Sequence, residues 1–576
     1  MSPLAQAKAT LASSFGHIDY RPGQEGAIEA VLDGRDALIV MPTGAGKSLC
    51  YQLPALVLPG VTIVVSPLIA LMKDQVDVLV GRSIPAVFIN STLNSSGISE
   101  RLQQVLGGQV KLLYVAPERF YDRRFLEALR DVRVSLLAVD EAHCISEWGH
   151  DFRPSYLSLK TVLERLGSPN EGSRKLGRPP VLALTATATP DVRDDIISSL
   201  GLKEPYVLVS GFDRPNLKYG VILSDPMDKL VRSLELVQRV NGPTIIYAGT
   251  RDAVDQIIEA FGWNDIPAVG YHAGMAKADR DRNQERFMAD DARVMVATNA
   301  FGLGVDKPNV RLLIHFNMPG TLEAYYQEAG RAGRDGREAF TTLLYHPSDR
   351  YLREFFLQGE NPSPELVRAV WRYLTYQVGS PIYATYNEIL SGVGLKVPEL
   401  AIGTALTVLE RAGYLRRPKS GAAEAFMRAV QPFAAIEAAL GPRAKVQREV
   451  WAALKLKFGG ELEAGIHFSA EEVVQGSDVT REGLSRSLRA LAEKNLIVYE
   501  PPARGQEIRL LRAGNERELE IDWTALRRKR EHEEGKLNHM ETYATATGCR
   551  RALILGYFGD TSTALRCDAC DNCLTH

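Results

Sequence analysis

The sequence predicts an α/β protein built on parallel β-sheets, with smaller modules toward its C-terminal end. Two observations carry this prediction. An apolar, β-branched run at residues 37–40 leads through a glycine-bearing turn into an apolar helical segment, and a second apolar run at 134–139 ends in two adjacent carboxylates. Further strand and helix patterns of this kind follow between residues 242 and 319. Strand–loop–helix units that recur along a chain are typical of parallel sheets.

The length and composition of the chain bound the kind of protein it can be. With 576 residues it is too long for a single core, and with 45% hydrophobic and 24% charged residues it has the composition of a globular protein. No uncharged apolar run approaches the roughly 18–20 residues that span a bilayer. The N-terminus "MSPLAQAKATLASSFG" lacks the pattern of a secretory signal. We therefore expect a cytoplasmic protein without a membrane partner. A net charge of -2 neither indicates nor excludes nucleic acid, because charge can be concentrated in one groove.

The first strand–loop–helix unit, "DALIVMPTGAGKS", has the features of a phosphate-binding loop. Gly44 and Gly46 let the backbone approach phosphate oxygens, and the following helix N-terminus supplies unpaired N–H groups. Lys47 is expected to contact the β- and γ-phosphates of ATP, and Ser48 to place its hydroxyl on Mg²⁺. The strict pattern has a glycine where this chain has Met41, so a chance match is the alternative. The candidate nucleotide-binding residues of this loop are Thr43, Gly44, Gly46, Lys47 and Ser48.

A pair of carboxylates follows the apolar strand of "VSLLAVDEAH". Asp140 is expected to hold Mg²⁺, and Glu141 to orient and deprotonate the attacking water. The alternative is a solvated acidic turn after a core strand. The later strand "VLALTATAT" is expected to couple the nucleotide site to motion through Thr185 and Thr187.

The second series of strands and helices closes with "AYYQEAGRAGRDG", which contains Arg331 and Arg334. These two residues lie on one face if the segment is helical. An arginine there can reach across a cleft and stabilise charge on the transferring phosphoryl group. The alternative is a basic surface turn. Catalytic groups on two lobes would convert ATP-dependent closure into movement.

Taken together, these motifs resemble those of a RecQ-family DNA helicase of superfamily 2, with a DEAH box. The matching stretches, in family order over roughly residues 10–345, are "FGHIDYRPGQ", "MPTGAGKS", "SPLIALMKDQ", "YVAPERF", "DEAHCISEWGHDFRP", "LTATAT", "FDRPNL", "ATNAFGLGVDKPNVR" and "YQEAGRAGRDG". The resemblance implies two RecA-like helicase lobes, at residues 1–205 and 206–350. It also implies that Gln24 reads the adenine edge and that Arg21 packs on the ring. His17 stands where many relatives have an aromatic residue, and imidazole can also stack.

The segment from Cys144 to Pro154 resembles the aromatic-rich loop with which this family senses single-stranded DNA. Trp148 and Phe152 offer faces for base stacking, and Arg153 suits a phosphate. The alternative for Trp148 is packing in the core, as is usual for tryptophan.

The segment "GENPSP" is predicted to be a linker. Beyond it, two sets of helix and strand patterns indicate winged-helix modules, at residues 360–425 and 440–515. One interpretation is that these modules bind duplex DNA, mainly through the second module. Its candidate recognition helix carries Arg481, Arg486 and Arg489, and its wing carries Arg504. The alternative is a solvated helical face in a module that binds protein.

Four of the six cysteines end the chain with the spacing C-x17-C-x2-C-x2-C. Four thiolates satisfy a tetrahedral Zn²⁺ in a closed structural site. Redox disulfides and an iron–sulfur cluster are the alternatives. The candidate metal ligands are Cys549, Cys567, Cys570 and Cys573.

This last module, residues 520–576, begins with a long charged helix or a helical pair. It resembles the zinc-binding module that directly follows the second lobe in most RecQ relatives, whereas here the winged-helix modules intervene. We expect a helical hairpin that folds back against the second lobe. The winged-helix modules would then be an insertion between that lobe and the zinc-binding module.

The leading hypothesis is an ATP-dependent 3′–5′ DNA helicase acting in recombination and repair, with single-stranded and duplex DNA as partners. Polarity and pathway follow from the resemblance, which also places a bacterial member at the nucleoid. One alternative is a DNA-dependent translocase or annealing factor with weak unwinding. Another is a DNA-binding regulator with a vestigial motor, which the intact catalytic residues oppose. An RNA helicase is disfavoured by the aromatic-rich loop.

Overall fold

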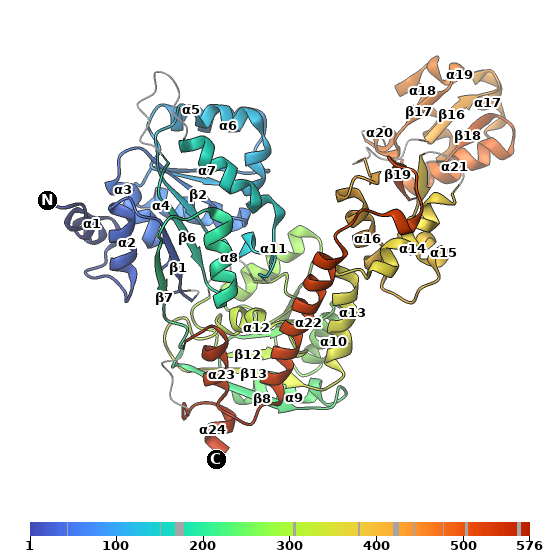
Figure 1. Ribbon diagram of the computed structural model, residues 1–576. Coiled ribbons are helices and arrows are strands. Elements are labelled where there is room, and N and C mark those ends of the chain that lie inside the picture. The colour runs from blue at the N-terminus through green and yellow to red at the C-terminus, as the bar shows by residue number, and fades with distance from the viewer. Residues whose placement is uncertain are drawn as a thin grey trace. The chain divides into compact units, whose positions relative to one another are not determined.

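The computed structural model describes residues 1–42, 44–149, 151–167, 178–302, 307–377, 381–418, 425–441, 444–475, 477, 479–501, 505–560 and 566–575. They form two compact units (Figure 1). The first contains Met1–Arg353 together with Glu531–His576, and the second contains Glu354–Arg530. None of the helices in the described ranges combines the length and hydropathy needed to cross a membrane.

The first lobe of the first unit is a seven-stranded parallel sheet in the order β3-β4-β2-β5-β6-β1-β7. Its central strands are apolar and fully buried, as expected when helices cover both faces of a parallel sheet. The strands are β1 (Ala37–Val40), β2 (Val61–Val65), β3 (Ala86–Ile89), β4 (Leu112–Val115), β5 (Val134–Val139), β6 (Val181–Thr185) and β7 (Tyr206–Val209). Its α-helices are α1 (Pro3–Thr10), α2 (Gln24–Leu32), α3 (Leu49–Val57), α4 (Ile69–Gly81), α5 (Ser95–Leu106), α6 (Arg123–Leu129), α7 (Leu159–Gly167) and α8 (Pro190–Leu200). Short non-α turns are η1 (Leu11–Phe15), η2 (Pro117–Tyr121), η3 (Ala142–Ile145) and η4 (Pro154–Ser158).

The second lobe is a six-stranded parallel sheet in the order β10-β11-β9-β12-β13-β8. The strands are β8 (Leu217–Leu223), β9 (Thr244–Tyr247), β10 (Ala268–Tyr271), β11 (Val294–Ala297), β12 (Leu312–His315) and β13 (Ala339–Tyr345). The helices are α9 (Lys229–Arg239), α10 (Arg251–Gly262), α11 (Lys277–Met288), α12 (Leu322–Ala329) and α13 (Asp349–Glu360), the last of which continues into the second unit. The expected lobe boundary at residue 205 falls too early, because β7 pairs with β1 and so completes the first sheet.

The C-terminal segment returns to the second lobe, as the sequence predicted. It consists of α22 (Trp523–Thr545), a single long helix, followed by α23 (Arg550–Tyr557) and α24 (Asp571–Thr575). Arg551 Nη2 donates to the carbonyl of Leu217 at 3.0 Å. Asp571 accepts from the backbone N–H of Val221 at 2.8 Å and from Arg550 Nε at 2.6 Å. The segment is thus fastened to strand β8 and the chain just before it.

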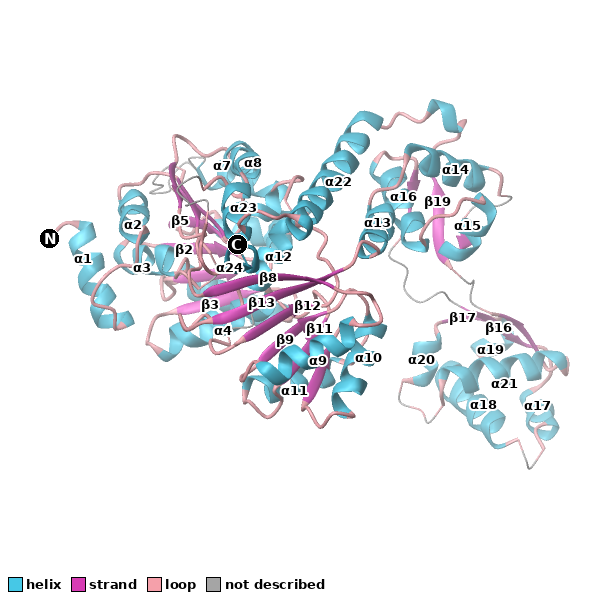
Figure 2. Ribbon diagram, turned by 90° about the horizontal axis from the view of Figure 1, so that it is seen from below, coloured by secondary structure: helices cyan, strands magenta, loops and turns pink. Residues whose placement is uncertain are grey.

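The second unit contains two small modules, each with helices packed on a three-stranded antiparallel sheet (Figure 2). The first has strands β14 (Ile382–Ala384), β15 (Leu415–Arg416) and β19 (Gln506–Leu510), and helices α14 (Pro364–Thr375), α15 (Tyr386–Val393) and α16 (Glu399–Arg411). The second has strands β16 (Ala425–Ala429), β17 (Ile466–Phe468) and β18 (Ile497–Glu500), and helices α17 (Phe433–Ala439), α18 (Lys445–Phe458), α19 (Glu461–Ala464), α20 (Ala470–Val474) and α21 (Arg481–Glu493). A short turn, η5 (Glu516–Glu518), follows β19.

The predicted extent of the second module, 440–515, is wrong at both ends. Strand β19 pairs with β14 and β15 of the first module, because its Ile508 is fully buried in that module's core. Strand β16, which falls between the two predicted ranges except for its first residue, is the centre of the second sheet. The second module is therefore inserted between β15 and β19, two neighbouring strands of the first.

A buried ion pair joins three parts of the second lobe. Lys229, at the start of α9, donates to both carboxylate oxygens of Asp349 at 2.9 and 2.7 Å, and the two side chains are only 2% and 6% exposed. Lys229 also donates to the carbonyl of Phe316 at 3.0 Å, and Asp349 accepts from Asn317 Nδ2 at 3.1 Å. Because both charges are buried and hydrogen-bonded, the pair fixes the start of α13 relative to α9 and to the loop after β12.

Replacing Lys229 by Met should destabilise the protein by about 3–5 kcal/mol, because it leaves the Asp349 carboxylate buried without its counter-charge. The measurement is the midpoint of urea-induced unfolding, followed by circular dichroism. Lys218→Met is the matched control, since the Lys218–Glu338 pair spans 3.4 Å with side chains 30% and 59% exposed. That change should alter stability by less than about 1 kcal/mol. Equal effects of the two substitutions would contradict the assignment.

Candidate nucleotide cleft and metal centre

The phosphate-binding loop lies between β1 and α3, where the sequence placed it. Gly44 and Gly46 adopt φ angles of 85° and 89°, in the left-handed region that favours glycine. A Cβ on Gly46 would lie 2.6 Å from Gln24 Nε2, so a side chain there would displace the glutamine. Thr43 lies outside the described residues.

Lys47 is held inside this loop by the loop's own backbone. Its Nζ donates to the carbonyls of Met41 at 2.9 Å and Pro42 at 3.2 Å. Desolvation lowers the pKa of Lys47, while the nearby Glu141 and Asp140 carboxylates oppose that shift. The ammonium is thus positioned at the mouth of the loop, facing the two carboxylates.

The carboxylate pair begins directly after β5. The backbone N–H of Asp140 donates to Val65 at 2.8 Å, and that of Glu141 donates to Asp140 Oδ1 at 3.0 Å. Desolvation, followed by the Glu141 charge, raises the pKa of Asp140 to about 7, against the opposing effect of Lys47. Glu141 has a φ of 48°, and its Oε2 is buried without a hydrogen-bond donor among the described residues. Two adjacent carboxylates, one with a buried oxygen that accepts no hydrogen bond from the described residues, suit a hydrated divalent cation, whose charge would favour ionised Asp140, so these residues fit Mg²⁺.

His143 links the acid pair to the neighbouring strand. Its Nδ1 lies 2.8 Å from Thr185 Oγ1 and 3.3 Å from Glu141 Oε2. Burial lowers the pKa of His143 to about 4, so the ring is neutral at neutral pH. Thr185 Oγ1 in turn donates to the carbonyl of Thr187 at 3.2 Å. The residues expected to couple the site to motion are therefore connected to it by hydrogen bonds.

Arg331 and Arg334 reach this site from the second lobe, but they lie in the turn that follows α12 and not on a helix face. Gly330 ends the helix, so the condition that placed both arginines on one helical face is not met. The Arg331 side chain is nevertheless buried, and its Nε has no acceptor among the described residues. A cavity of about 440 Å³ brings the two lobes' residues together. It is lined by, among others, Lys47, Ser48, Asp140, Glu141, Arg331 and Arg334.

A second cavity, of about 270 Å³, adjoins the loop on the side expected to hold the base and is lined by His17, Arg21 and Gln24. Gln24 Nε2 donates to the carbonyl of Gly46 at 3.0 Å, and Arg21 Nη1 donates to that of Gly44 at 2.7 Å. His17 is exposed at its rim. The expected base-binding residues are thus tied to the phosphate-binding loop itself.

Phe15 and Arg82 are among the residues of this second cavity that sequence reasoning missed. Arg82 Nη1 donates to the carbonyl of Phe15 at 3.1 Å, and its guanidinium lies 5.7 Å from the centre of the phenyl ring. Arg82 follows α4, far along the chain from the segment it holds, and its sequence context gives no signal of this role.

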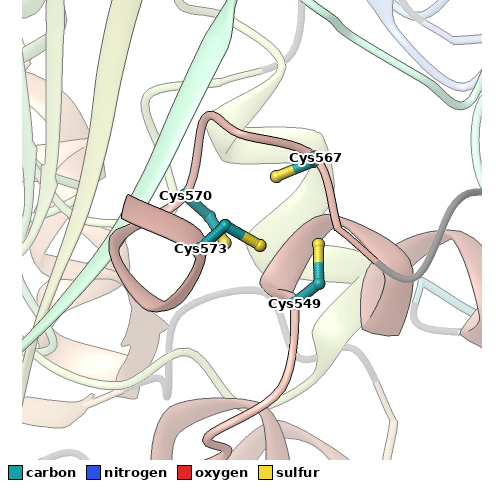
Figure 3. Close-up of side chains that lie close together, drawn as sticks. All are labelled: Cys549, Cys567, Cys570 and Cys573. Carbon is teal, nitrogen blue, oxygen red and sulfur yellow. The ribbon is translucent and has the colours of Figure 1, made fainter. Parts of the chain in front are cut away.

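The four C-terminal cysteines converge, with sulfur atoms that all lie within 4.8 Å of one another (Figure 3). Cys549 comes from the residue before α23, and Cys570 and Cys573 come from the turn that includes the start of α24. All four are free thiols, which does not support the disulfide alternative. Ligands on a tetrahedral zinc ion, at about 2.3 Å each, lie roughly 3.8 Å apart, so this donor set fits zinc after a small contraction.

Comparison with known proteins agrees with these sites. The description "DEAD/DEAH box helicase" matches residues 21–196, "Helicase conserved C-terminal domain" matches 226–336, and "RecQ zinc-binding" matches 508–574. The ATP-dependent DNA helicase RecQ of Bacillus subtilis is 44% identical over 357 residues, which cover 62% of this chain and 58% of that protein. The probable ATP-dependent DNA helicase RecS of the same organism is 40% identical over 374 residues, covering 64% of this chain and 73% of that protein. The chain belongs to the RecQ family of DNA helicases.

This RecQ-family chain spans less than three fifths of the length of the first RecQ proteins it matches, 58%, 57% and 56% of them. Among solved structures, the crystal structure of the DUF1998 helicase MrfA bound to DNA is 18% identical, with a TM-score of 0.49, and covers 73% of this chain and 59% of that one. The family match gives the Cys549–Cys573 cluster its identity: it is the RecQ zinc site, and the zinc is structural because four thiolates leave no open position.

The aromatic-rich loop of this family lies next to the nucleotide cleft. A cavity of about 260 Å³ is lined by Glu141 and His143 from the acid-pair segment, by Arg153 and by Arg331. The Arg153 guanidinium donates to Asp151 Oδ2 at 3.2 and 2.9 Å, so in this structure it is paired with a carboxylate. Phe152 is half-buried.

Trp148 is half-buried and packs against α22, a contact that sequence reasoning did not foresee. Its ring meets that of His532 edge to face, with centroids 4.9 Å apart. Trp148 is therefore neither fully buried in the core nor open on all sides for base stacking. A mixed-charge helix gives no sequence signal for such a contact.

The expected duplex contact, Arg486, is exposed on α21 and has no carboxylate partner among the described residues. Its neighbour Arg481 is paired with Glu471. Arg504 lies outside the described residues. The Arg486 side chain is thus accessible on the surface of α21.

Replacing Cys570 by Ser should remove the bound zinc, because three thiolates and a hydroxyl bind it far more weakly than four thiolates. The measurement is the zinc content after dialysis against a mild chelator, where the wild type should keep about one equivalent. Cys50→Ser is the control, since Cys50 is buried beside the phosphate-binding loop and should not affect zinc. Iron with labile sulfide in the wild type would contradict a zinc site.

Replacing Asp140 by Asn should stabilise the magnesium-free protein at pH 8 by up to about 4 kcal/mol, because each unit of raised pKa corresponds to about 1.4 kcal/mol. The raised pKa of Asp140 means that the folded wild type loses stability as the pH rises from the unfolded value near 4 through about 7. The advantage of Asn should therefore disappear near pH 4. Thermal melts from pH 4 to 8 test this, with the exposed Asp194→Asn on α8 as control, and a pH-independent difference would contradict it.

Proposed function

We propose that this chain is an ATP-dependent DNA helicase that unwinds duplex DNA with 3′–5′ polarity and acts in recombination and repair. One observation supports the proposal above all others. A single cavity contains the ammonium and carboxylates of the first lobe and the guanidinium groups of the second. Polarity and pathway rest on membership of the RecQ family, whose members named above are called ATP-dependent DNA helicases.

The residues of the cleft divide the hydrolysis of ATP among them. Lys47 and the phosphate-binding loop hold the phosphates, and Asp140 would hold Mg²⁺, which neutralises phosphate charge when bound. Glu141 Oε2, buried and unpaired, accepts a proton from the attacking water. Arg331 and Arg334 stabilise the negative charge that develops on the transferring group.

ATP hydrolysis would be coupled to movement because the groups that carry it out come from two different lobes. The carboxylates come from the first lobe and the arginines from the second, so the cavity holds all of these groups only at one separation of the lobes. Hydrolysis and product release then change that separation. A strand of DNA lying across both lobes would be moved with each cycle.

DNA would reach the motor at two places. The aromatic-rich loop, with Trp148, Phe152 and Arg153, lies a few residues beyond Glu141 and would bind single-stranded DNA by stacking and charge. The modules of the second unit, with Arg486 on an exposed helix, would bind the duplex ahead of it. Protein partners are not indicated.

A second function is a DNA-dependent translocase or annealing factor with weak unwinding. The observation that favours it is the insertion of the second module between β15 and β19. In a winged-helix module these two strands form the wing, so the element that would engage or split the duplex differs in this chain.

The test measures ATP hydrolysis with and without single-stranded DNA, together with unwinding of duplexes that carry a 3′ or a 5′ single-stranded tail. The helicase should be stimulated by DNA and should unwind the 3′-tailed duplex. Lys47→Ala should reduce both activities by at least about 100-fold, as expected when a charge-stabilising group leaves a water-poor site. Lys218→Met, far from the cleft lining, is the control and should behave as wild type.

Each other outcome selects a different function. DNA-stimulated hydrolysis without unwinding would indicate the translocase, and stimulation by RNA alone would indicate an RNA helicase. Hydrolysis that DNA does not stimulate would refute a DNA-driven motor.

A further inference from the structure

We propose that His532 and Lys536 of α22 are positioning residues that hold the aromatic-rich loop in a docked state and thereby set how much single-stranded DNA is needed to stimulate ATP hydrolysis. The inference rests on the proposed function. It concerns a contact between the loop and the C-terminal helix, two segments that lie far apart in the sequence.

The docking contact consists of one ring packing and two polar bonds. The rings of His532 and Trp148 meet at 67°, with centroids 4.9 Å apart, and His532 Nε2 lies 3.2 Å from the carbonyl oxygen of Trp148. One helical turn further along α22, Lys536 Nζ donates to the carbonyl of Gly149 at 3.0 Å. Two consecutive carbonyls of the loop are therefore bound by one face of α22.

The burial of Lys536 indicates that this contact is a specific part of the fold. Its side chain is 3% exposed, and it also pairs with Glu533 at 2.8 Å. A buried ammonium is destabilising unless charge and hydrogen bonds compensate for lost water. Glu533 supplies the counter-charge and Gly149 the carbonyl acceptor, so the helix retains a buried cation at the point where it meets the loop.

The docked loop is connected by backbone hydrogen bonds to the acid-pair segment. Ser146 N–H donates to the carbonyl of His143 at 3.2 Å, and Gly149 N–H donates to that of Ser146 at 3.0 Å. Gly149 packs so tightly that a Cβ would lie 2.5 Å from the His143 carbonyl oxygen. A shift of Trp148 and Gly149 would therefore also displace His143, and with it the contacts that His143 makes with Glu141 and Thr185.

Single-stranded DNA and α22 compete for the same loop. A base that stacks on the Trp148 indole needs a free ring face, whereas His532 packs against that ring. DNA must then draw the loop away from α22, and the docked contact opposes it. Because α22 begins in the second unit and continues into the first, the helix that holds the loop is also one of the two covalent connections to the modules proposed to bind duplex.

The experiment uses the full chain and measures ATP hydrolysis against the concentration of a single-stranded oligothymidylate. His532→Ala should lower the DNA concentration that gives half-maximal stimulation by about 3–10-fold, the range expected for one aromatic contact, with the maximal rate unchanged. His532→Phe retains a ring for Trp148 and should lie between the alanine variant and wild type. His539→Ala is the matched control, since His539 is an exposed histidine of the same helix that packs on Tyr557.

A spectroscopic measurement separates docking from general destabilisation. The emission of Trp148 is obtained as the difference between each chain and its counterpart that also carries Trp148→Phe. In the absence of DNA, His532→Ala should make this emission more accessible to quenching by acrylamide, and His539→Ala should not.

An unchanged or raised half-maximal DNA concentration in His532→Ala would overturn the inference, as would unchanged quenching of Trp148. If the alanine variant does not fold, His532→Phe and the quenching measurement decide the question. Failure of the proposed function is a separate result, because it would appear as a wild-type ATPase that DNA does not stimulate.

Discussion

Two carboxylates, an ammonium and two guanidinium groups share one cavity between the lobes of the first unit, and the rest of the structure is arranged around this accumulation of charge. Desolvation there raises the pKa of Asp140 and lowers that of Lys47, so each group depends on the opposite charges that face it. Parallel sheets make the arrangement possible, because the carboxyl ends of neighbouring strands meet at one edge. Strand β6 lies between β1 and β5, which brings Thr185 beside the histidine that follows the acid pair.

The position of the two arginines, Arg331 and Arg334, depends on how the C-terminal segment packs against the second lobe. Helix α12 directly precedes the two arginines, and the zinc-bearing segment covers it. Tyr325 and Tyr326 of α12 meet Tyr543 and Phe558, with a hydroxyl contact of 2.7 Å in the first pair and ring centroids 5.0 Å apart in the second. Tyr557 donates to Glu323 at the start of the same helix at 2.8 Å. The zinc-bearing C-terminal segment therefore packs against the helix that precedes the arginines, although it lies far from them in sequence.

Much of this site could be predicted because its chemically important residues lie in short, contiguous motifs. Strands β1 and β5 and helix α3 are where apolar runs placed them, and Lys47, Asp140, Glu141 and the four cysteines converge as their spacing indicated. The arginines reach the cavity although the helix expected to carry them ends first. Predicted DNA contacts at Trp148, Phe152, Arg153 and Arg486 stay predictions.

The sequence alone indicated the candidate residues for nucleotide and for zinc, because a phosphate loop, an acid pair after a strand and a cysteine cluster each need particular residue types at fixed short spacings. Only the tertiary structure decided which distant segments meet. Strand β19 joins the first small module because Ile508 is buried in that module's core. His532 and Lys536 meet the aromatic-rich loop because the C-terminal helix returns to the first unit. Such contacts depend on burial between segments that lie far apart in the sequence, so no short motif predicts them.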